Sequence, residues 1–279
     1  MNKAGSRASR YWLGTAALVV TAVVFVVPFL FILFMAIKDR KQSSLLDFSL
    51  PTSNNLISNV VEVVKARDYM LVTAFINSTI LTVASVAGMV VLGAMVAFVR
   101  QRRYSRWNRL IDLLVLSGLI IPPAVVPTIW VLQKLGIFRT LPGLILIEIA
   151  FGLSFTILLF QAFISTIPKE LDEAAILDGA GPFRLFFRVI FPLLKSVVVT
   201  VIVVQSVFVF NDFVNPLYFL PGDDNATVQL TLFNFKSQFT TEWNLLFTDI
   251  LLITLPMLVL FIFFNRKIVE GMTAGAVKG

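Results

Sequence analysis

Apolar residues in this chain come in long blocks that are separated by short polar connections. Six of these blocks are long enough for an α-helix to cross a hydrocarbon layer of about 30 Å. The pattern therefore predicts membrane spans at residues 11–37, 70–99, 110–133, 143–165, 196–217 and 246–264. The first block is longer than the apolar part of a secretory signal, so we expect it to remain in the mature chain.

The composition supports an integral membrane protein. Of the 279 residues, 58% are hydrophobic and only 14% are charged, which departs far from an average soluble domain. A transmembrane barrel would need alternating polar and apolar positions, and these blocks lack that alternation. We therefore predict an all-α bundle of six transmembrane helices that forms one membrane domain over residues 1–279.

The chain has no cysteine and no histidine. Disulfides, thiolate nucleophiles, imidazole bases and the usual zinc ligands are therefore excluded, and we expect no catalytic residue and no metal site. The sequence also contains no Gly-x-x-x-x-Gly-Lys-Ser/Thr phosphate loop. Any ATP hydrolysis must therefore be supplied by another subunit.

Basic residues are distributed unevenly between the two sides of the predicted bundle. Fifteen of the 23 Lys and Arg residues fall in segments 1–10, 100–109, 166–195 and 265–279, which the six spans place on one side. Because basic residues accumulate on the cytoplasmic side, this count predicts that both termini are cytoplasmic. The net charge of +7 then reflects membrane topology, and we expect no binding of nucleic acid.

Two spans have unusual compositions. The second is rich in small residues, which allow close approach of neighbouring helices and indicate a place inside the bundle. The third contains Pro122, Pro123 and Pro127, and such breaks are tolerated in lipid only where protein or water satisfies the backbone. These prolines indicate either a lining of the transport path or a simple packing kink.

The connection at residues 166–195 is the most informative segment, and it predicts two short helices. Pro168 suits a first helical position, and the acids that follow it suit the positive end of a helix dipole. Gly179 is expected to end this helix in a left-handed conformation, and Gly181 begins a new direction before Pro182. Asp178 is unfavourable at a helix C-terminus, which indicates that a partner surface uses it.

The second short helix carries an apolar stripe. Its helical spacing predicts that one face packs on the membrane body, and this face consists of Phe183, Phe186, Phe187 and Ile190. Arg184 and Arg188 are expected on another face, toward the cytoplasm. A plain amphipathic connector is the alternative interpretation.

This connection resembles the permease subunits of ABC importers. Their cytoplasmic signature matches Glu173-Ala174-Ala175, then Gly179, and then Ile190-Phe191-Pro192. The resemblance implies the type I importer permease fold, with a cytoplasmic coupling helix that docks into a separate ATPase. By the same resemblance, the docking residues are Glu173, Ala174, Ala175, Asp178, Gly179 and Gly181.

The likeness narrows to the maltose-type carbohydrate branch through Phe75-Ile76-Asn77-Ser78, Val209-Phe210-Asn211-Asp212-Phe213 and the closing residues. The last five residues are implied to contact the ATPases, and they are Gly275, Ala276, Val277, Lys278 and Gly279. Phe191, Ser196 and Phe210 depart from the residues common in that branch. None of these departures falls on Glu173 or Gly179, so they bear on the predicted substrate class more than on the predicted coupling to an ATPase.

The resemblance implies a non-catalytic permease subunit for uptake of a sugar or oligosaccharide across the bacterial inner membrane. Its implied partners are a second homologous permease, a dimeric ABC ATPase that binds ATP and magnesium, and an extracytoplasmic substrate-binding protein. This chain is expected to bind no cofactor itself. The alternatives are an importer of a sugar-like solute such as glycerol phosphate, a self-sufficient secondary transporter, or a membrane-embedded enzyme.

Polar residues inside the spans are candidates for the translocation path. Asn211, Asp212 and Asn215 precede Pro216 in the fifth span, and Asn77 and Gln205 are weaker candidates. The alternative is that they only bridge helices or cap broken helix ends. Glu148 and Asp249 are expected near the membrane interfaces and receive no role.

Overall fold

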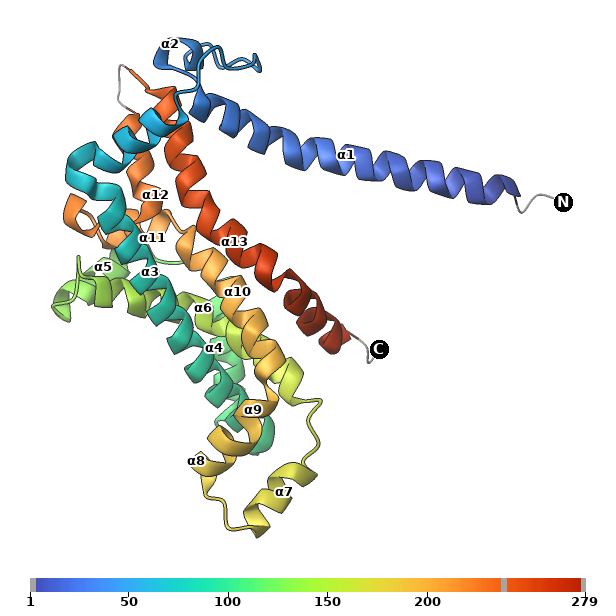
Figure 1. The fold of residues 1–279 in the computed structure, drawn as a ribbon. Coiled ribbons are helices and arrows are strands. Elements are labelled where there is room, and N and C mark those ends of the chain that lie inside the picture. The colour runs from blue at the N-terminus through green and yellow to red at the C-terminus, as the bar shows by residue number, and fades with distance from the viewer. Residues whose placement is uncertain (1–3, 237–239, 277–279) are drawn as a thin grey trace. The chain divides into compact units, whose positions relative to one another are not determined.

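The computed structural model describes residues 4–236 and 240–276 of the chain (Figure 1). Within these ranges the structure is helical, with one isolated antiparallel bridge between Lys236 and Thr241. Four helices are long and apolar enough to cross a membrane, and two bent helix pairs bring the number to six if each pair is one span. The predicted all-α class is confirmed.

The chain divides into two compact units. The first contains residues 1–71 and 231–255, with α1 (Ala4–Ile37), α2 (Arg40–Ser43), the 3-10 turn η3 (Leu232–Phe235) and the first part of α13 (Trp243–Ala276). Asn59 joins its helices, because its amide donates to the Ala36 carbonyl at 2.8 Å and its Oδ1 accepts from Asn244 at 3.0 Å.

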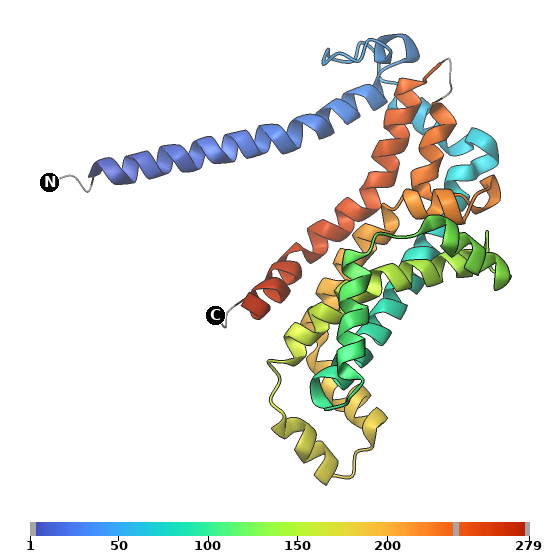
Figure 2. The ribbon, with the colours of Figure 1, turned by 180° about the vertical axis from the view of Figure 1, so that it is seen from behind.

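The second unit contains residues 72–230 and 256–279. Most of α3 (Leu56–Arg102) belongs to it, together with the helices of the middle of the chain. These helices are α4 (Asn108–Ile120), α5 (Val125–Lys134), α6 (Leu141–Ile164), α10 (Lys195–Phe210), α11 (Val214–Phe219) and α12 (Val228–Thr231), with the 3-10 turn η2 (Asp223–Asn225). Its core is a cluster of buried side chains that includes Ala94 of α3, Phe160 of α6 and Val201 of α10. Figure 2 shows the ribbon of the chain from behind.

Close approach of α3 and α6 explains the small residues of the second predicted span. A Cβ atom on Gly88 would lie 2.5 Å from Ile149 Cδ1, and one on Gly93 would lie 2.6 Å from Thr156 Cγ2. Ala94 and Ala97 are fully buried. Larger residues at these positions would separate the two helices, so the predicted place of this segment inside the bundle is confirmed.

Two of the predicted spans, the third and the fifth, differ from the observed helices, whereas the second agrees with its helix. In α3 the backbone is non-helical from Ala66 to Tyr69, so the long straight segment begins near the predicted start at residue 70. The third span is broken into α4 and α5, which are bent by 119°. Pro122 and Pro123 lie in the break, where they lack backbone donors and favour an extended conformation in the preceding residue, Ile121.

The fifth predicted span also ends earlier than expected. The prediction extended it to residue 217, whereas α10 ends at Phe210 and the separate helix α11 begins at Val214. The physical reason is Asp212, whose Oδ1 accepts hydrogen bonds from the Val214 amide at 2.8 Å and the Asn215 amide at 3.3 Å. A side chain that satisfies the first amides of a new helix stabilises a helix start at this point.

Candidate coupling loop and membrane cavity

The loop between α6 and α10 contains four short helical segments. They are α7 (Glu170–Leu177), α8 (Pro182–Arg184), the π-helical segment η1 (Leu185–Ile190) and α9 (Phe191–Leu193). Three acids occupy the first turn of α7, as the dipole argument predicts. Pro168 is not the first helical residue, because it lies after the turn that follows α6 and the helix begins only at Glu170.

The end of α7 is a glycine-dependent turn. Gly179 has φ of +78°, so the predicted left-handed conformation is confirmed. Its amide donates to the Ile176 carbonyl at 2.9 Å, and the amide of Ala180 donates to the Ala175 carbonyl at 2.9 Å. This pair of bonds is the Schellman arrangement, in which the left-handed position strongly favours glycine.

Most of the candidate docking residues point into solvent. Glu173, Ala174, Asp178, Gly179 and Gly181 are exposed, and nothing lies within 4 Å of a Cβ atom built on either glycine. Apolar side chains beside them are also uncovered, since Leu177 is 88% exposed and Phe183 is 73% exposed. The exception is Ala175, which is half-buried and packs against the core of the second unit.

An ion pair holds α7 against the end of α3. Arg102 Nε lies 2.7 Å from Asp172 Oδ2, and both side chains are nearly buried, at 10% and 12% exposure. The Arg102 guanidinium also donates to the Ile167 carbonyl at 2.8 Å. Burial raises the pKa of Asp172 above its ordinary value, and the attraction to Arg102 partly opposes that rise. The ion pair therefore fixes the position of the loop and leaves its outer face open.

The apolar face predicted for the second helix is only partly correct. Phe186 and Ile190 are buried, but Phe183 and Phe187 are exposed, and Leu185 is buried in their place. The segment Leu185–Ile190 is π-helical, and its wider turn shifts which side chains share a face. Arg184 and Arg188 are exposed, as predicted.

A cavity of about 730 Å³ lies among the helices of the second unit. It contains three of the four residues predicted for the translocation path, together with Gln205 and the unassigned Glu148. Its lining consists of Met89, Glu148, Phe151, Gly152, Phe155, Gln205, Val207, Phe208, Val209, Asn211, Asp212 and Asn215.

Every polar side chain of this cavity also has a partner inside the protein. Asn215 Nδ2 donates to Glu148 Oε1 at 3.1 Å, and Gln205 Nε2 donates to Thr156 Oγ1 at 2.9 Å. Asn211 Oδ1 accepts from Gln229 at 3.1 Å. The two interpretations of these residues therefore do not exclude one another, because the same groups bridge helices and line the cavity.

Asn77 and the three prolines are not part of this lining. The Asn77 amide donates to the Ala226 carbonyl at 3.1 Å, which connects α3 to the segment after α11. Pro122 and Pro123 lie in the break between α4 and α5, Pro127 lies in the first turn of α5, and none of the three lines the cavity. The structure thus separates Asn77 from Asn211, Asp212 and Asn215.

Comparison with known proteins identifies the family. Residues 89–273 match the family described as the binding-protein-dependent transport system inner membrane component. The chain belongs to this family. The match includes both the loop between α6 and α10, which is the candidate coupling loop, and the cavity.

Relatives of this membrane component are similar over most of its length. It is 34% identical over 209 residues to the melibiose/raffinose/stachyose import permease protein MelC of Bacillus subtilis, which covers 74% of this chain and 76% of MelC. It is 32% identical over 279 residues to the trehalose transport system permease protein SugB of Mycobacterium tuberculosis, which covers 99% of this chain and all of SugB.

The fold of this membrane component is also found in a solved structure. A bacterial ABC transporter involved in the import of the acidic polysaccharide alginate contains a chain that superposes with a TM-score of 0.81. The superposition covers 95% of this chain and 98% of that chain, at 17% sequence identity. The importer permease fold expected from the sequence is confirmed.

Other predictions for the membrane component fall at its C-terminus. Gly275 and Ala276 are the last residues of α13. Val277, Lys278 and Gly279 lie outside the residues that the structure describes. Contact of this tail with ATPases stays a prediction.

Sequence reasoning missed three important side chains of the membrane component. Glu148 and Asp249 received no role, but both are buried, and Asp249 accepts a hydrogen bond from Thr231 at 2.9 Å. Their signal was an ionisable residue within an apolar block, which usually marks a functional or paired group. Arg102 carried no such signal, because its partner Asp172 is 70 residues away, in a connection that contains both basic and acidic residues.

Proposed function

We propose that this chain is a permease subunit of an ABC importer that takes up carbohydrate. The observation that carries this proposal is the exposed coupling segment, Glu173 to Gly181, which projects from a loop fixed by the Arg102–Asp172 pair. Relatives named for import of melibiose, raffinose and stachyose and for trehalose transport support a sugar as the substrate class.

In the proposed mechanism, the coupling segment seats in a groove of a separate ATPase. Leu177 and Phe183 supply apolar area that a partner can cover, and Glu173 and Asp178 supply charge at its rim. ATP and magnesium bind to the partner, whose closure moves α7. The ion pair with Arg102 and the packing of Ala175 then pass this motion to α3 and the bundle core.

The family supports the rest of the proposed assembly. A second permease subunit completes the path, and an extracytoplasmic binding protein delivers the sugar on the opposite side of the membrane. The excess of Lys and Arg in the coupling loop and near both termini supports a cytoplasmic position for these segments. The chain then lies in the bacterial inner membrane as a non-catalytic transport subunit.

The cavity has chemistry that suits an uncharged sugar. Phe151, Phe155 and Phe208 offer apolar faces for sugar rings, and Asn211 and Asn215 offer amide groups for hydroxyls. Glu148 and Asp212 are the only ionisable groups of its lining, and both are acids. Carboxylates next to the path disfavour acidic sugars, so we expect neutral sugars to be transported in preference to uronic acids.

The decisive experiment reverses the charge of one side chain in the proposed docking segment. Glu173→Lys is expected to abolish co-purification of the ATPase subunits, because it reverses a charge on the proposed docking face. Glu170→Lys is the matched control, since Glu170 is also exposed in the first turn of α7 but lies outside the signature. Both variants are compared for membrane insertion, ATPase recovery and ATP-dependent sugar uptake.

Two results would contradict the proposal. Equal ATPase recovery by Glu173→Lys and Glu170→Lys would remove the docking role of the signature. Sugar uptake by this chain alone, driven by an ion gradient without ATP, would favour a secondary transporter. Uptake of glycerol phosphate in preference to sugars would be consistent with an ABC importer and would change only the proposed substrate.

A further inference from the structure

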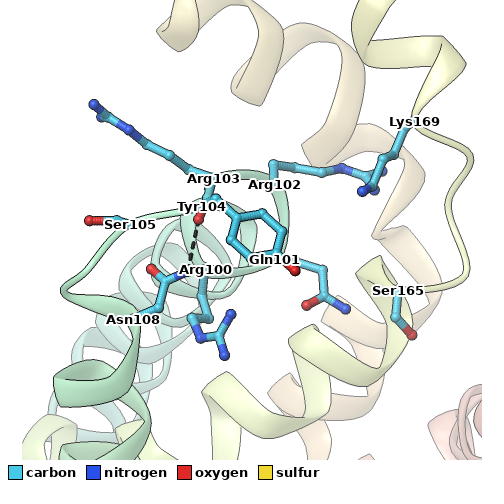
Figure 3. A pocket seen from close by; sticks show the side chains of 9 residues that line it. All are labelled: Arg100, Gln101, Arg102, Arg103, Tyr104, Ser105, Asn108, Ser165 and Lys169. Carbon is cyan, nitrogen blue, oxygen red and sulfur yellow. Dashed lines mark hydrogen bonds between the residues drawn. The ribbon is translucent and has the colours of Figure 1, made fainter.

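A second cavity lies at the connection between α3 and α4 (Figure 3). Its volume is about 420 Å³, and it includes the last residues of α3, the first residue of α4 and two residues that follow α6. Its lining is strongly basic and consists of Arg100, Gln101, Arg102, Arg103, Tyr104, Ser105, Asn108, Ser165 and Lys169.

The positive charge of this pocket is only partly neutralised. Arg100 pairs with Asp112, and Arg102 pairs with Asp172. Within residues 4–236 and 240–276, no carboxylate forms an ion pair with Arg103 or Lys169. Figure 3 shows the Arg102 side chain directed toward Lys169, while Arg103 extends from the other side of the connection. The pocket therefore holds two cations that an anionic ligand could neutralise.

The residues that follow and alternate with those of this pocket in the sequence form a separate apolar groove. It has a volume of about 590 Å³ and is formed by Arg106, Trp107, Arg109, Leu110 and Leu113. The Arg106 guanidinium carbon lies 5.5 Å from the centre of the Trp107 ring. Tyr104 is fully exposed and Trp107 is 57% exposed, and both residue types are favoured at the level of lipid headgroups.

The combination of a basic pocket and an apolar groove fits one class of ligand. We infer that this pocket, with Lys169 on one side and Arg103 on the other, receives the phosphate headgroup of an anionic phospholipid whose acyl chains lie along Leu110 and Leu113. A free phosphate ion would use the basic pocket but not the exposed apolar side chains of the groove. The position between the ends of two apolar helices also places the pocket where headgroups lie.

The lipid would contact the residues that hold the coupling loop. Arg102 lines the pocket and pairs with Asp172, and Lys169 is the residue immediately before α7. An anionic headgroup at this point attracts Arg102 and Lys169. Its electric field acts on these two cations together with the field of the Asp172 carboxylate. The site thus connects the membrane composition to the position of the coupling loop, independently of the substrate transported.

The test measures lipid preference at Trp107. In the full-length chain, Trp12, Trp130 and Trp243 are replaced by Phe, so that Trp107 is the remaining tryptophan. The protein is reconstituted in vesicles of brominated phosphatidylcholine, which quenches tryptophan, with increasing amounts of unbrominated phosphatidylglycerol. We expect phosphatidylglycerol to displace the quencher in preference to unbrominated phosphatidylcholine by roughly five-fold for each cation involved.

The double variant Arg103→Gln/Lys169→Gln is expected to lower this preference by about five-fold or more. Arg184→Gln/Lys195→Gln is the matched control, because it removes the same charge from exposed positions outside the pocket and the groove. An equal fall in the control would show diffuse attraction and overturn the proposal.

Inorganic phosphate distinguishes the two sources of the anion. At constant ionic strength, phosphate is expected to leave the lipid preference unchanged, and a saturable loss of preference would assign the pocket to free phosphate instead. Native mass spectrometry of the chain with all four tryptophans provides a second measurement. Retention of phosphatidylglycerol by the control variant but not by Arg103→Gln/Lys169→Gln supports the site, and equal retention by both overturns it.

Discussion

The coupling loop and the membrane cavity use polar residues in opposite ways. In the loop, Glu173 and Asp178 are exposed, and the buried Asp172 holds the loop in place. In the cavity, Asn215 and Gln205 both line the open space and form hydrogen bonds between helices. The residues proposed for function therefore differ from those that stabilise the structure in the loop, whereas in the cavity they are the same residues.

This difference has a practical meaning for mutagenesis. A surface substitution in the loop is expected to change partner binding while folding is preserved, because exposed positions contribute little to stability. A substitution in the cavity changes a buried hydrogen bond as well, so a loss of transport alone does not assign a role there. Stability and transport must be measured together in that region.

The largest effect is expected when the loop loses its ion pair. Asp172→Asn leaves the Arg102 guanidinium nearly buried without its counter-charge, at a cost of about 2–3 kcal/mol. We expect α7 to detach from α3 and ATP-dependent uptake to fall by more than about tenfold, since about 1.4 kcal/mol corresponds to tenfold in an equilibrium. Limited proteolysis of the loop and ATPase recovery measure the change.

Asp112→Asn is the control for this prediction. It breaks the Arg100–Asp112 pair, which is more exposed and does not hold α7, so a cost of at most about 1 kcal/mol is expected. In the double variant Arg102→Gln/Asp172→Asn, the loss should be smaller than the sum of the single losses. Additive losses would mean that the pair does not act as a unit.

The next largest effect concerns the bridge between α6 and α11. Asn215→Ala leaves the Glu148 carboxyl group buried without its amide donor, and we expect a stability loss of about 2 kcal/mol. Glu148→Gln in the same chain should recover part of that loss, because an uncharged amide is less costly to bury. Thermal unfolding of the purified chain in detergent tests both expectations, and no recovery would contradict a role for the buried carboxyl group.

Gln205→Leu is expected to have a smaller effect, of about 1 kcal/mol. The substitution removes the hydrogen bonds to Thr156 and to the Gly152 carbonyl, but the Thr156 hydroxyl keeps its own bond to Gly152 at 2.9 Å. Asn211→Leu is the comparison, since Asn211 is exposed and should lower stability less. If Asn211→Leu lowers uptake while thermal unfolding is unchanged, the cavity role is separated from the structural role.

A similarly small effect is expected at the loop glycines. Gly179→Ala places a Cβ atom at φ of +78°, which costs about 1 kcal/mol without any clash. Gly181→Ala has an ordinary φ of −71° and is expected to have almost no effect. ATPase affinity in titration compares the two, and equal affinities would show that the left-handed turn does not matter for docking.

The fold could be predicted from local patterns to a large extent. Apolar blocks gave the positions of α6 and of the long part of α3, and Gly179 gave the end of α7, because each depends on residues close in sequence. The break at Phe210 and the π-helical segment Leu185–Ile190 were not predictable in this way. They depend on an Asp212 cap and on core packing that shifts the register of the aromatic side chains.

The candidate sites show the same limit. The signature residues of the loop are contiguous and could be found directly, whereas the Arg102–Asp172 and Glu148–Asn215 pairs join segments that are 70 and 67 residues apart. No periodicity connects such positions. The local sequence offers one indication of such a pair, which is a single acid within an apolar block. It marks Glu148 as a candidate functional or paired residue, but it does not predict that Asn215 is the partner.

The uncovered Leu177 and Phe183 have a consequence for how the cell makes this subunit. Their side chains are 88% and 73% exposed, so copies made in excess of the proposed ATPase partner would present exposed apolar surfaces to each other and to chaperones. Balanced synthesis of the subunits would protect the chain, and rapid degradation of orphan copies is the expected alternative fate.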